Sequence, residues 1–320
     1  MKAEPGKILA ITLNTAIDKV YAVDNFTVGG VFRPREMTAT AGGKGLNVAR
    51  VAHLLEAAII ATGFLGGGNG SFIEKQVRET GIEAAFVHIA GESRICINIT
   101  DQKNSISTEV LEPGPVISPQ EQEDFLRHYR QLLTQCKVVT ASGSLPQGVP
   151  SDFYRTLIEI AVAQKVPFIL DSSGEALEQG VKANPYMIKP NQEEVQRLAR
   201  LDNESDPLPL AELAGALQRL QRGGIVMPCI SLGKEGCLAA LPDGIYHFYG
   251  PPLQVVNPVG SGDAFVAGCA VGLTRGMNSP DVIKLGMASG MANTQFFKTG
   301  MVSLELVAQY LQEIQFTALG

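Results

Sequence analysis

Short apolar runs alternate with amphipathic segments along most of the chain, and this pattern predicts an α/β fold. Such runs are typical of strands buried on both faces of a parallel sheet, and they lie at 7–13, 59–65, 138–142, 167–171, 186–189 and 227–232. Segments with apolar residues at helical spacing follow several of them, at 44–55, 151–164 and 209–222. A repeated order of strand, helix and strand favours one mostly parallel sheet with helices on both faces.

Two other segments have the two-residue period of exposed strands. Residues from about 20 to 40 alternate in polarity between glycines, and those from about 94 to 110 begin with the alternating sequence RICINIT. We expect both to form a small sheet outside the main one, placed to act as a lid. If this lid folds over the ligand edge, Arg94 would reach a bound phosphate with its bidentate fork; otherwise it is an ordinary surface residue. No linker or repeat divides the sequence, so residues 1–320 are predicted to form a single domain with this lid.

The amino-acid composition indicates which binding partners and which cellular environment suit this protein. A net charge of −6 argues against a general nucleic-acid or anionic-membrane surface, so an anionic ligand would need a local basic site. Five cysteines, an odd number without Cys-x-x-Cys spacing, favour reduced thiols over a disulfide framework or a zinc site. No apolar run is long enough to span a bilayer. These features predict a soluble, cytoplasmic protein.

The clearest chemical signal is the segment NPVGSGDAFVAG at 257–268, in which a glycine-rich turn leads into an apolar helix. Free N–H groups of Gly260, Ser261 and Gly262, with the positive end of the helix dipole, would form a site for an anion such as a phosphoryl group. Asp263 follows directly. Either it caps the helix, or it accepts a proton beside the bound anion, since a carboxylate would otherwise repel that ligand.

A second glycine-rich turn, AGGKGLN, opens another amphipathic helix. Gly43 allows a ligand to approach the backbone closely, and Lys44 and Asn47 offer a cation and an amide. The turn lacks the G-x-G-x-x-G spacing of dinucleotide-binding proteins and the Ser/Thr that follows lysine in a Walker A loop. Upstream, Asp18 follows the first predicted strand, where it either holds sugar hydroxyls or is an ordinary solvated turn residue.

Further candidates lie at the ends of later predicted strands. Lys189 precedes Asn191 and Glu194, whose spacing fits a helix capping box and equally fits a site where a lysine contacts nucleotide phosphates beside ligands for Mg²⁺. The segment SLGKEG at 231–236 offers a serine hydroxyl and glycine amides to a phosphate oxygen, although such turns also occur without any ligand.

Four motifs together resemble the PfkB family of carbohydrate kinases, which has the ribokinase-like fold. They are AGGKGLNVA, KPNQEE, SLGKEG and NPVGSGDAFVAG, in the order that the family has, so the resemblance covers nearly the whole chain. Within the family, TLNTAID, GGKG, SRICINI and LEPGP are similar to the branch that phosphorylates ketohexose monophosphates. That branch holds 1-phosphofructokinase and tagatose-6-phosphate kinase, and NPVGSGDA looks closer to the second of these.

The resemblance implies a kinase that uses ATP and Mg²⁺, with a role for each motif. Asp263 would take the proton from the acceptor hydroxyl, and the amides of 260–262 would hold the transferring phosphoryl group. The hydroxyls of the acceptor would contact Asp18, Gly43 and Asn47, and its phosphate Lys44 and Arg94. The ATP phosphates would contact Lys189, Ser231, Gly233 and Gly236, the adenine Asn293, and the metal region Asn191, Glu194 and Asp171.

Three points stay open. The acceptor is tagatose-6-phosphate, fructose-1-phosphate or fructose-6-phosphate, which differ in the position of the phosphate or in the configuration of one hydroxyl. A non-catalytic sensor of sugar phosphates or nucleotides is the alternative of a different class, although such a protein would be expected to have lost Asp263. We also predict a homodimer that pairs through the lid, because the lid strands would have exposed edges.

Overall fold

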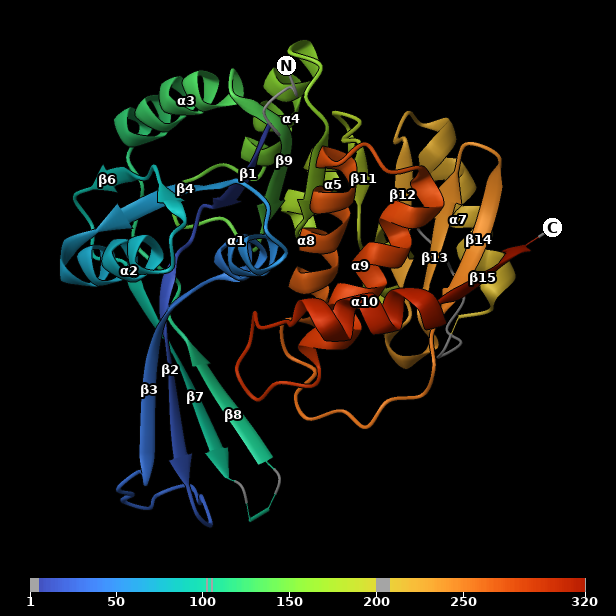
Figure 1. Ribbon diagram of the computed structural model, residues 1–320. Helices are drawn as coiled ribbons and strands as arrows, with labels where there is room; N and C mark the ends of the chain where they lie inside the picture. Colours follow the sequence, from blue (N-terminus) through green and yellow to red (C-terminus); the bar gives the residue numbers. More distant parts are fainter. Residues whose placement is uncertain (1–5, 102, 105, 200–207, 320) are drawn as a thin grey trace.

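A large sheet forms the centre of the molecule, and a small sheet extends away from it beneath α1 (Lys44–Leu54) and α2 (Gly67–Glu79) (Figure 1). The computed structural model describes residues 6–101, 103–104, 106–199 and 208–319. The prediction of a main sheet with a smaller, separate sheet is therefore confirmed.

The large sheet contains 11 strands within the described residues. They are β1 (Lys7–Thr12), β4 (Ile59–Gly66), β5 (Glu83–Ala84), β6 (Val87–Ile89), β9 (Cys136–Ser142), β10 (Phe168–Asp171), β11 (Met187–Ile188), β12 (Met227–Ser231), β13 (Cys237–Leu241), β14 (Gly244–Tyr249) and β15 (Gln315–Leu319). Their order is β15-β14-β13-β12-β11-β10-β9-β1-β4-β5, and β6 also pairs with β4. In the part of the sheet that runs from β12 through β1 to β5 and β6, all neighbouring strands are parallel. In the part that runs from β12 to β15, they are antiparallel.

Helices cover both faces of this sheet, which explains why its strands read as continuous apolar runs. In β1, Ile8 and Ala10 join one core, whereas Leu9 and Ile11 join the core on the opposite face. The first core includes α1 and α2 together with α8 (Ser261–Thr274), α9 (Ser279–Asn293) and α10 (Leu304–Glu313). The second includes α3 (Pro119–Leu133), α4 (Phe153–Ala163) and α5 (Gly174–Val181), and a third joins α6 (Gln192–Ala199) and α7 (Leu210–Arg222) to β12–β14.

The small sheet has the strand order β3 (Glu36–Gly42), β2 (Ala16–Val23), β7 (Arg94–Asp101) and β8 (Ile106–Leu111). Only its β2–β7 pair is parallel. One boundary differs from the prediction: β2 already begins at Ala16, so Asp18 lies inside a lid strand, opposite Thr40 and Cys96, and not in the turn after β1. The physical reason is that residues 16–22 pair with β3 and residues 16–23 pair with β7.

Alternation gives the small sheet two different faces, because successive strand residues point to opposite sides. The pairing register places on one face Ile17, Tyr21, Met37, Ile97, Ile99 and Val110, with Lys19 among them. The other face carries Asp18, Thr40, Arg94, Asn98, Glu109 and Ser107. One side is therefore mostly apolar and the other mostly polar, although Val20 and Leu111 also lie on the polar side.

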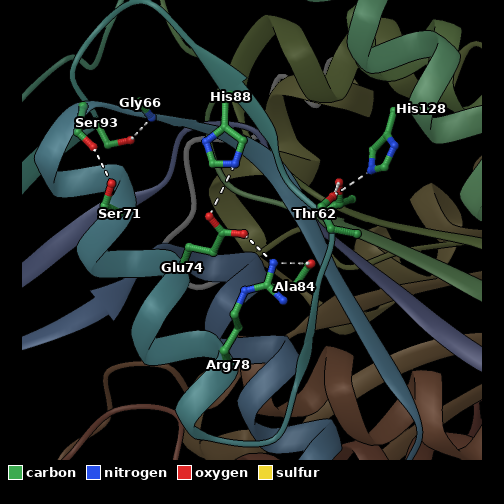
Figure 2. A network of polar contacts seen from close by, with 11 residues as sticks. Thr62, Gly66, Ser71, Glu74, Arg78, Ala84, His88, Ser93 and His128 are labelled. Atoms are coloured by element: carbon green, nitrogen blue, oxygen red, sulfur yellow. Dashed lines mark hydrogen bonds and ion pairs between the residues drawn. The ribbon is translucent and has the colours of Figure 1, made fainter.

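The root of β7 is fastened to the main sheet and α2 by polar contacts (Figure 2). The Ser93 hydroxyl accepts a hydrogen bond of 3.0 Å from the Gly66 N–H, and the Ser93 N–H donates one of 3.0 Å to the Gly66 carbonyl. Nearby, the Glu74 carboxylate pairs with Arg78 at 2.6 Å and lies 3.4 Å from His88. The two bonds between Ser93 and Gly66 anchor Arg94, the residue after Ser93, to the main sheet.

Some elements were not predicted. The strand β15 and the helices α5 and α10 had no clear local signal, and α2 begins at Gly67, inside the glycine-rich run GGGNG at 66–70. Strand β15 exists because it pairs with β14, which lies far earlier in the chain.

The five cysteines are all free thiols, as predicted, and Cys136 and Cys229 are among those that are buried. Within the described residues, no helix is long and apolar enough to cross a membrane.

Candidate active site

The turn before α8 leaves backbone donors open at the start of the helix. Gly260 is the N-cap, with a left-handed φ of 81°, and a Cβ there would lie 2.4 Å from Thr299 Cγ2. The N–H groups of Gly260, Gly262 and Asp263 find no acceptor among the described residues, whereas the Ser261 N–H donates to the Pro258 carbonyl at 3.3 Å. Of the three amides predicted to bind an anion, that of Ser261 is therefore already engaged.

Asp263 is a buried carboxyl, with 5% of its surface exposed. It is not the N-cap of α8, because Gly260 has that position and no side-chain cap is present. Burial raises the pKa of Asp263 to about 7; the charge of Asp171 acts in the same direction, and a hydrogen bond from Asn47 and the charges of Lys44 and Lys189 oppose it. A carboxyl with a pKa near neutrality is well matched to accept a proton.

Lys189 lies beside this turn. Its ammonium is 3.3 Å from the Asp171 carboxylate and would be 3.3 Å from a Cβ placed on Gly262. Lys189 and Asp171 are both buried. Burial lowers the pKa of Lys189, but the attraction and hydrogen bond of Asp171, with a contribution from Asp263, outweigh it, so the pKa is raised. The lysine stays charged, and a fixed cation stands next to the open amides.

Helix α1 brings the second glycine-rich turn to the same place. Gly43 is its N-cap, and Lys44, its first residue, has an exposed side chain. Asn47 lies on the same side one turn later, is buried, and donates a hydrogen bond of 2.8 Å from Nδ2 to Asp263 Oδ2. The two motifs, far apart in the sequence, therefore meet at the carboxyl that was predicted to be the base.

The polar face of the small sheet also reaches this region. Burial raises the pKa of Asp18, against a hydrogen bond from the Gly43 N–H and the positive charges of Arg50 and Arg94. Arg94 Nε and Nη2 donate to the Asn14 carbonyl at 3.3 and 3.1 Å, and Nη1 donates to the Glu112 carbonyl at 2.9 Å. These bonds fix the guanidinium at the root of the lid and still leave N–H donors free, since the group has five.

The two remaining turns lie side by side, because Asn191 forms a parallel bridge with Ser231. Asn191 and Glu194 form the capping box: the Glu194 N–H donates to Asn191 Oδ1 at 2.8 Å, and the Asn191 N–H donates to Glu194 Oε2 at 2.9 Å. Gly233 begins a short 3₁₀ turn, Gly233–Glu235, that ends at Gly236. Among the described residues, no group of three or more His, Cys, Asp and Glu side chains could hold a metal.

Asn293 is 1% exposed, and backbone groups occupy its amide. Nδ2 donates to the Val259 carbonyl at 2.9 Å, and Oδ1 accepts from the N–H groups of Gly300 and Met301 at 2.9 and 3.3 Å. It therefore joins the turn before α8 to the loop after α9. Contact with adenine stays a prediction, as do the ligand contacts expected of the other motif residues.

One residue at this site was not predicted. Arg50 bonds to Asn47 and carries a charge that acts on both Asp18 and Asp263. Its position three residues after Asn47 on an amphipathic helix was the one available signal.

A profile of the pfkB family carbohydrate kinase matches residues 8–304. The chain belongs to the PfkB family of carbohydrate kinases. It is 38% identical over 310 residues to a tagatose-6-phosphate kinase from Staphylococcus epidermidis, which covers 96% of this chain and 98% of that relative. The predictions of family and of a kinase are thus confirmed.

Solved structures agree on the fold of this PfkB kinase. It is similar to a possible 1-phosphofructokinase from Thermotoga maritima, with a TM-score of 0.87, 26% identity, and coverage of 98% of this chain and 100% of that one. Ribokinase from Thermotoga maritima has a TM-score of 0.78 and 19% identity, with coverage of 96% and 100%. The ribokinase-like fold class is therefore confirmed.

Proposed function

We propose that this PfkB kinase transfers the γ-phosphoryl group of ATP to a hydroxyl of a ketohexose monophosphate, with tagatose-6-phosphate as the first candidate. The observation that carries the proposal is the buried Asp263 carboxyl, with a pKa raised to about 7, beside open amides and the Lys189 ammonium. The 38% identity to a tagatose-6-phosphate kinase supports this acceptor.

In this proposal Asp263 accepts the proton of the attacking hydroxyl, and the amides of Gly260 and Gly262 hold the transferring group. Phosphoryl transfer has a loose transition state, so most of the catalysis comes from positioning and charge stabilisation. Lys189, beside Gly262, supplies a positive charge at this point. Glu194 and Asp171 are the carboxylates that would face a Mg²⁺ ion, which would add positive charge at the phosphate oxygens.

The acceptor would lie between α1 and the polar face of the lid. Asp18, Gly43 and Asn47 would contact its hydroxyls, and Lys44 and Arg94 its phosphate. The lid would exclude water that could otherwise accept the phosphoryl group. On the other side, Ser231, Gly233 and Gly236 would contact the phosphates of ATP.

A coupled assay of ADP release with three sugars tests the proposal. We expect the highest kcat/KM with tagatose-6-phosphate, and a loss of about 10²–10⁴-fold in kcat for Asp263→Asn with nucleotide binding retained. A higher kcat/KM with fructose-1-phosphate would favour the second candidate, which the similarity to a possible 1-phosphofructokinase supports. Failure to phosphorylate any of the three, with nucleotide or sugar phosphate still bound, would indicate a sensor.

We also propose that the kinase is a homodimer that pairs through the lid and is located in the cytoplasm. The apolar face of the lid carries exposed Met37, Ile106 and Val110, with 58%, 54% and 55% of their surfaces accessible. An exposed, mostly apolar face of this kind is commonly covered by a partner. Five free thiols suit a reducing compartment.

A further inference from the structure

The guanidinium of Arg50 donates to three acceptors that belong to three separate parts of the molecule. Nη1 bonds to Asn47 Oδ1 at 3.0 Å and to the Thr299 carbonyl at 3.3 Å, and Nη2 bonds to the Ala41 carbonyl at 2.7 Å. These acceptors lie on α1, on the loop after α9 and on β3 of the lid. Arg50 is therefore the point at which the lid, the helix of the substrate turn and the loop behind the α8 turn are joined.

The first contact determines which way the Asn47 amide faces. A carboxamide has an acceptor oxygen on one side and donors on the other, and a guanidinium can only donate. With Oδ1 held by Arg50, Nδ2 must point towards Asp263, to which it donates at 2.8 Å. In the flipped orientation, the Asn47 oxygen would face the carboxylate and the amide donors would face the arginine, so both contacts would become repulsive.

The second contact leads to the turn that holds the open amides. A Cβ on Gly300 would lie 2.7 Å from Arg50 Nη1, and a Cβ on Gly260 would lie 2.4 Å from Thr299 Cγ2, so this loop packs tightly between the two. The Gly300 N–H in turn bonds to Asn293, whose other end donates to the Val259 carbonyl. Displacement of the guanidinium would therefore also shift the turn before α8, which carries the open N–H groups.

The third contact leads to the lid. Ala41 lies opposite Ile17 in the β2–β3 pair, next to Asp18, whose carboxyl attracts the Arg50 guanidinium. Arg50 consequently contacts the lid directly, at Ala41, and contacts Asp263 through Asn47.

We propose that Arg50 is a positioning residue for phosphoryl transfer: it orients the Asn47 amide against Asp263 and holds the lid strand β3 and the 299–300 loop at the same point. The inference rests on the proposed function, because it takes Asp263 to be the base. This role requires the planar guanidinium of arginine. A lysine at this position would keep the positive charge, but its single ammonium could not reach all three acceptors.

The first test compares Arg50→Lys with the wild-type kinase across pH. We expect kcat to fall about tenfold or more, with the KM for ATP unchanged, as for other groups that orient a ligand or a base from behind. The acidic limb of the kcat–pH profile should move to higher pH, because a freely turning Asn47 no longer stabilises the Asp263 carboxylate. The other charged groups that act on Asp263, which are Asp171, Lys44 and Lys189, are unchanged in this variant.

The matched control is Arg275→Lys. Arg275 likewise donates to a backbone carbonyl, from Nη2 to the Leu55 oxygen at 2.6 Å, but this bond joins the C-terminal ends of α8 and α1, away from Asp263. We expect this variant to lose some thermal stability and to keep the kcat and pH profile of the wild type.

A double-variant cycle separates positioning from general structural support. In an Asn47→Ala background, Arg50→Lys should lower kcat by a smaller factor than in the wild type, because only the contacts with Ala41 and Thr299 are then lost, and it should no longer move the acidic limb. Equal effects in both backgrounds, or an unchanged kcat and pH profile in Arg50→Lys alone, would overturn the inference.

A measurement without turnover distinguishes this inference from the proposed function. In protein labelled with ¹³C-carboxyl aspartate, with the Asp263 signal assigned by Asp263→Asn, Arg50→Lys should raise the titration midpoint of Asp263, and should do so only when Asn47 is present. An unmoved midpoint contradicts the role of Arg50 even if the kinase is active. If the wild-type kinase phosphorylates none of the three sugars but Arg50→Lys still raises the titration midpoint of Asp263, the result contradicts only the assignment of the acceptor.

Discussion

Asn47 Nδ2 donates a hydrogen bond of 2.8 Å to Asp263 Oδ2, joining residues that are 216 positions apart. This bond brings the start of α1 to the start of α8, and so places the two glycine-rich turns of the family on either side of one carboxyl. The pKa of that carboxyl is raised to about 7 by burial, although the bond itself acts to lower it.

The rate of the reaction should depend on the ionisation of Asp263. Because the base must be deprotonated and its pKa is raised to about 7, kcat should rise with pH through about 7 and then reach a plateau. In Asp263→Asn this limb should be absent at a much lower kcat. The check is a kcat–pH profile at saturating sugar and ATP; an acidic limb that persists in the variant would assign it to another group.

The free energy of unfolding should also depend on the ionisation of Asp263. Its change with pH should have the opposite sign to that produced by a carboxylate in a salt bridge. Since the folded pKa of about 7 lies above the value of 3.8 for a free aspartate, the unfolded state loses the proton first as pH rises. The free energy of unfolding of the wild type, relative to Asp263→Asn, should therefore fall between about pH 4 and pH 7. Urea unfolding of both proteins at several pH values measures this difference, and a difference that is constant with pH would contradict it.

The Lys189–Asp171 pair should be needed both for stability and for turnover. Lys189→Met leaves the buried Asp171 charge without a partner, so unfolding should become easier by about 3–5 kcal/mol. Adding Asp171→Asn should restore much of the stability but not kcat, because the cation beside Gly262 is still missing. Chemical unfolding and steady-state kinetics report the two effects, with exposed Lys182→Met as the control; recovery of kcat in the double variant would contradict the role of Lys189.

Lys44 and Arg94 should act on the sugar phosphate and not on ATP. A hydrogen bond to a charged group contributes about 1.5–3 kcal/mol, so Lys44→Ala and Arg94→Ala should each raise the KM for the sugar phosphate about tenfold or more. The KM for ATP should stay near that of the wild type. Lys19→Ala is the matched control, since Lys19 follows Asp18 on β2 and points to the opposite face. An equal rise in both KM values would indicate a distorted site instead.

The oligomeric state should depend on the apolar face of the lid. Val110→Lys places a charge on that face of β8, whereas Ser107→Lys places one on the opposite face of the same strand. We expect sedimentation equilibrium at micromolar concentration to give a dimer for the wild type and for Ser107→Lys, and a monomer for Val110→Lys. A monomeric wild type, or a dimeric Val110→Lys, would exclude pairing through this face.

Local patterns were sufficient for the main strands, most of the helices and the chemical motifs. Buried parallel strands such as β1 and β4 produce continuous apolar runs, and the glycines near Lys44 and Asp263 mark the turns that lead into α1 and α8. The boundary of β2 was missed because its first residues are strand only through pairing with β3 and β7.

The sequence by itself determined the α/β architecture and the glycine-rich turns, because strand and helix periods and turn chemistry are properties of neighbouring residues. It did not determine that Asn47 would meet Asp263, that Asp18 would belong to the lid, or that Arg50 would join the lid strand β3 to Asn47. These relationships come from packing across the sheet between residues far apart in the chain. Burial at that meeting point, and not the identity of any one motif, raises the pKa of Asp263 to about 7.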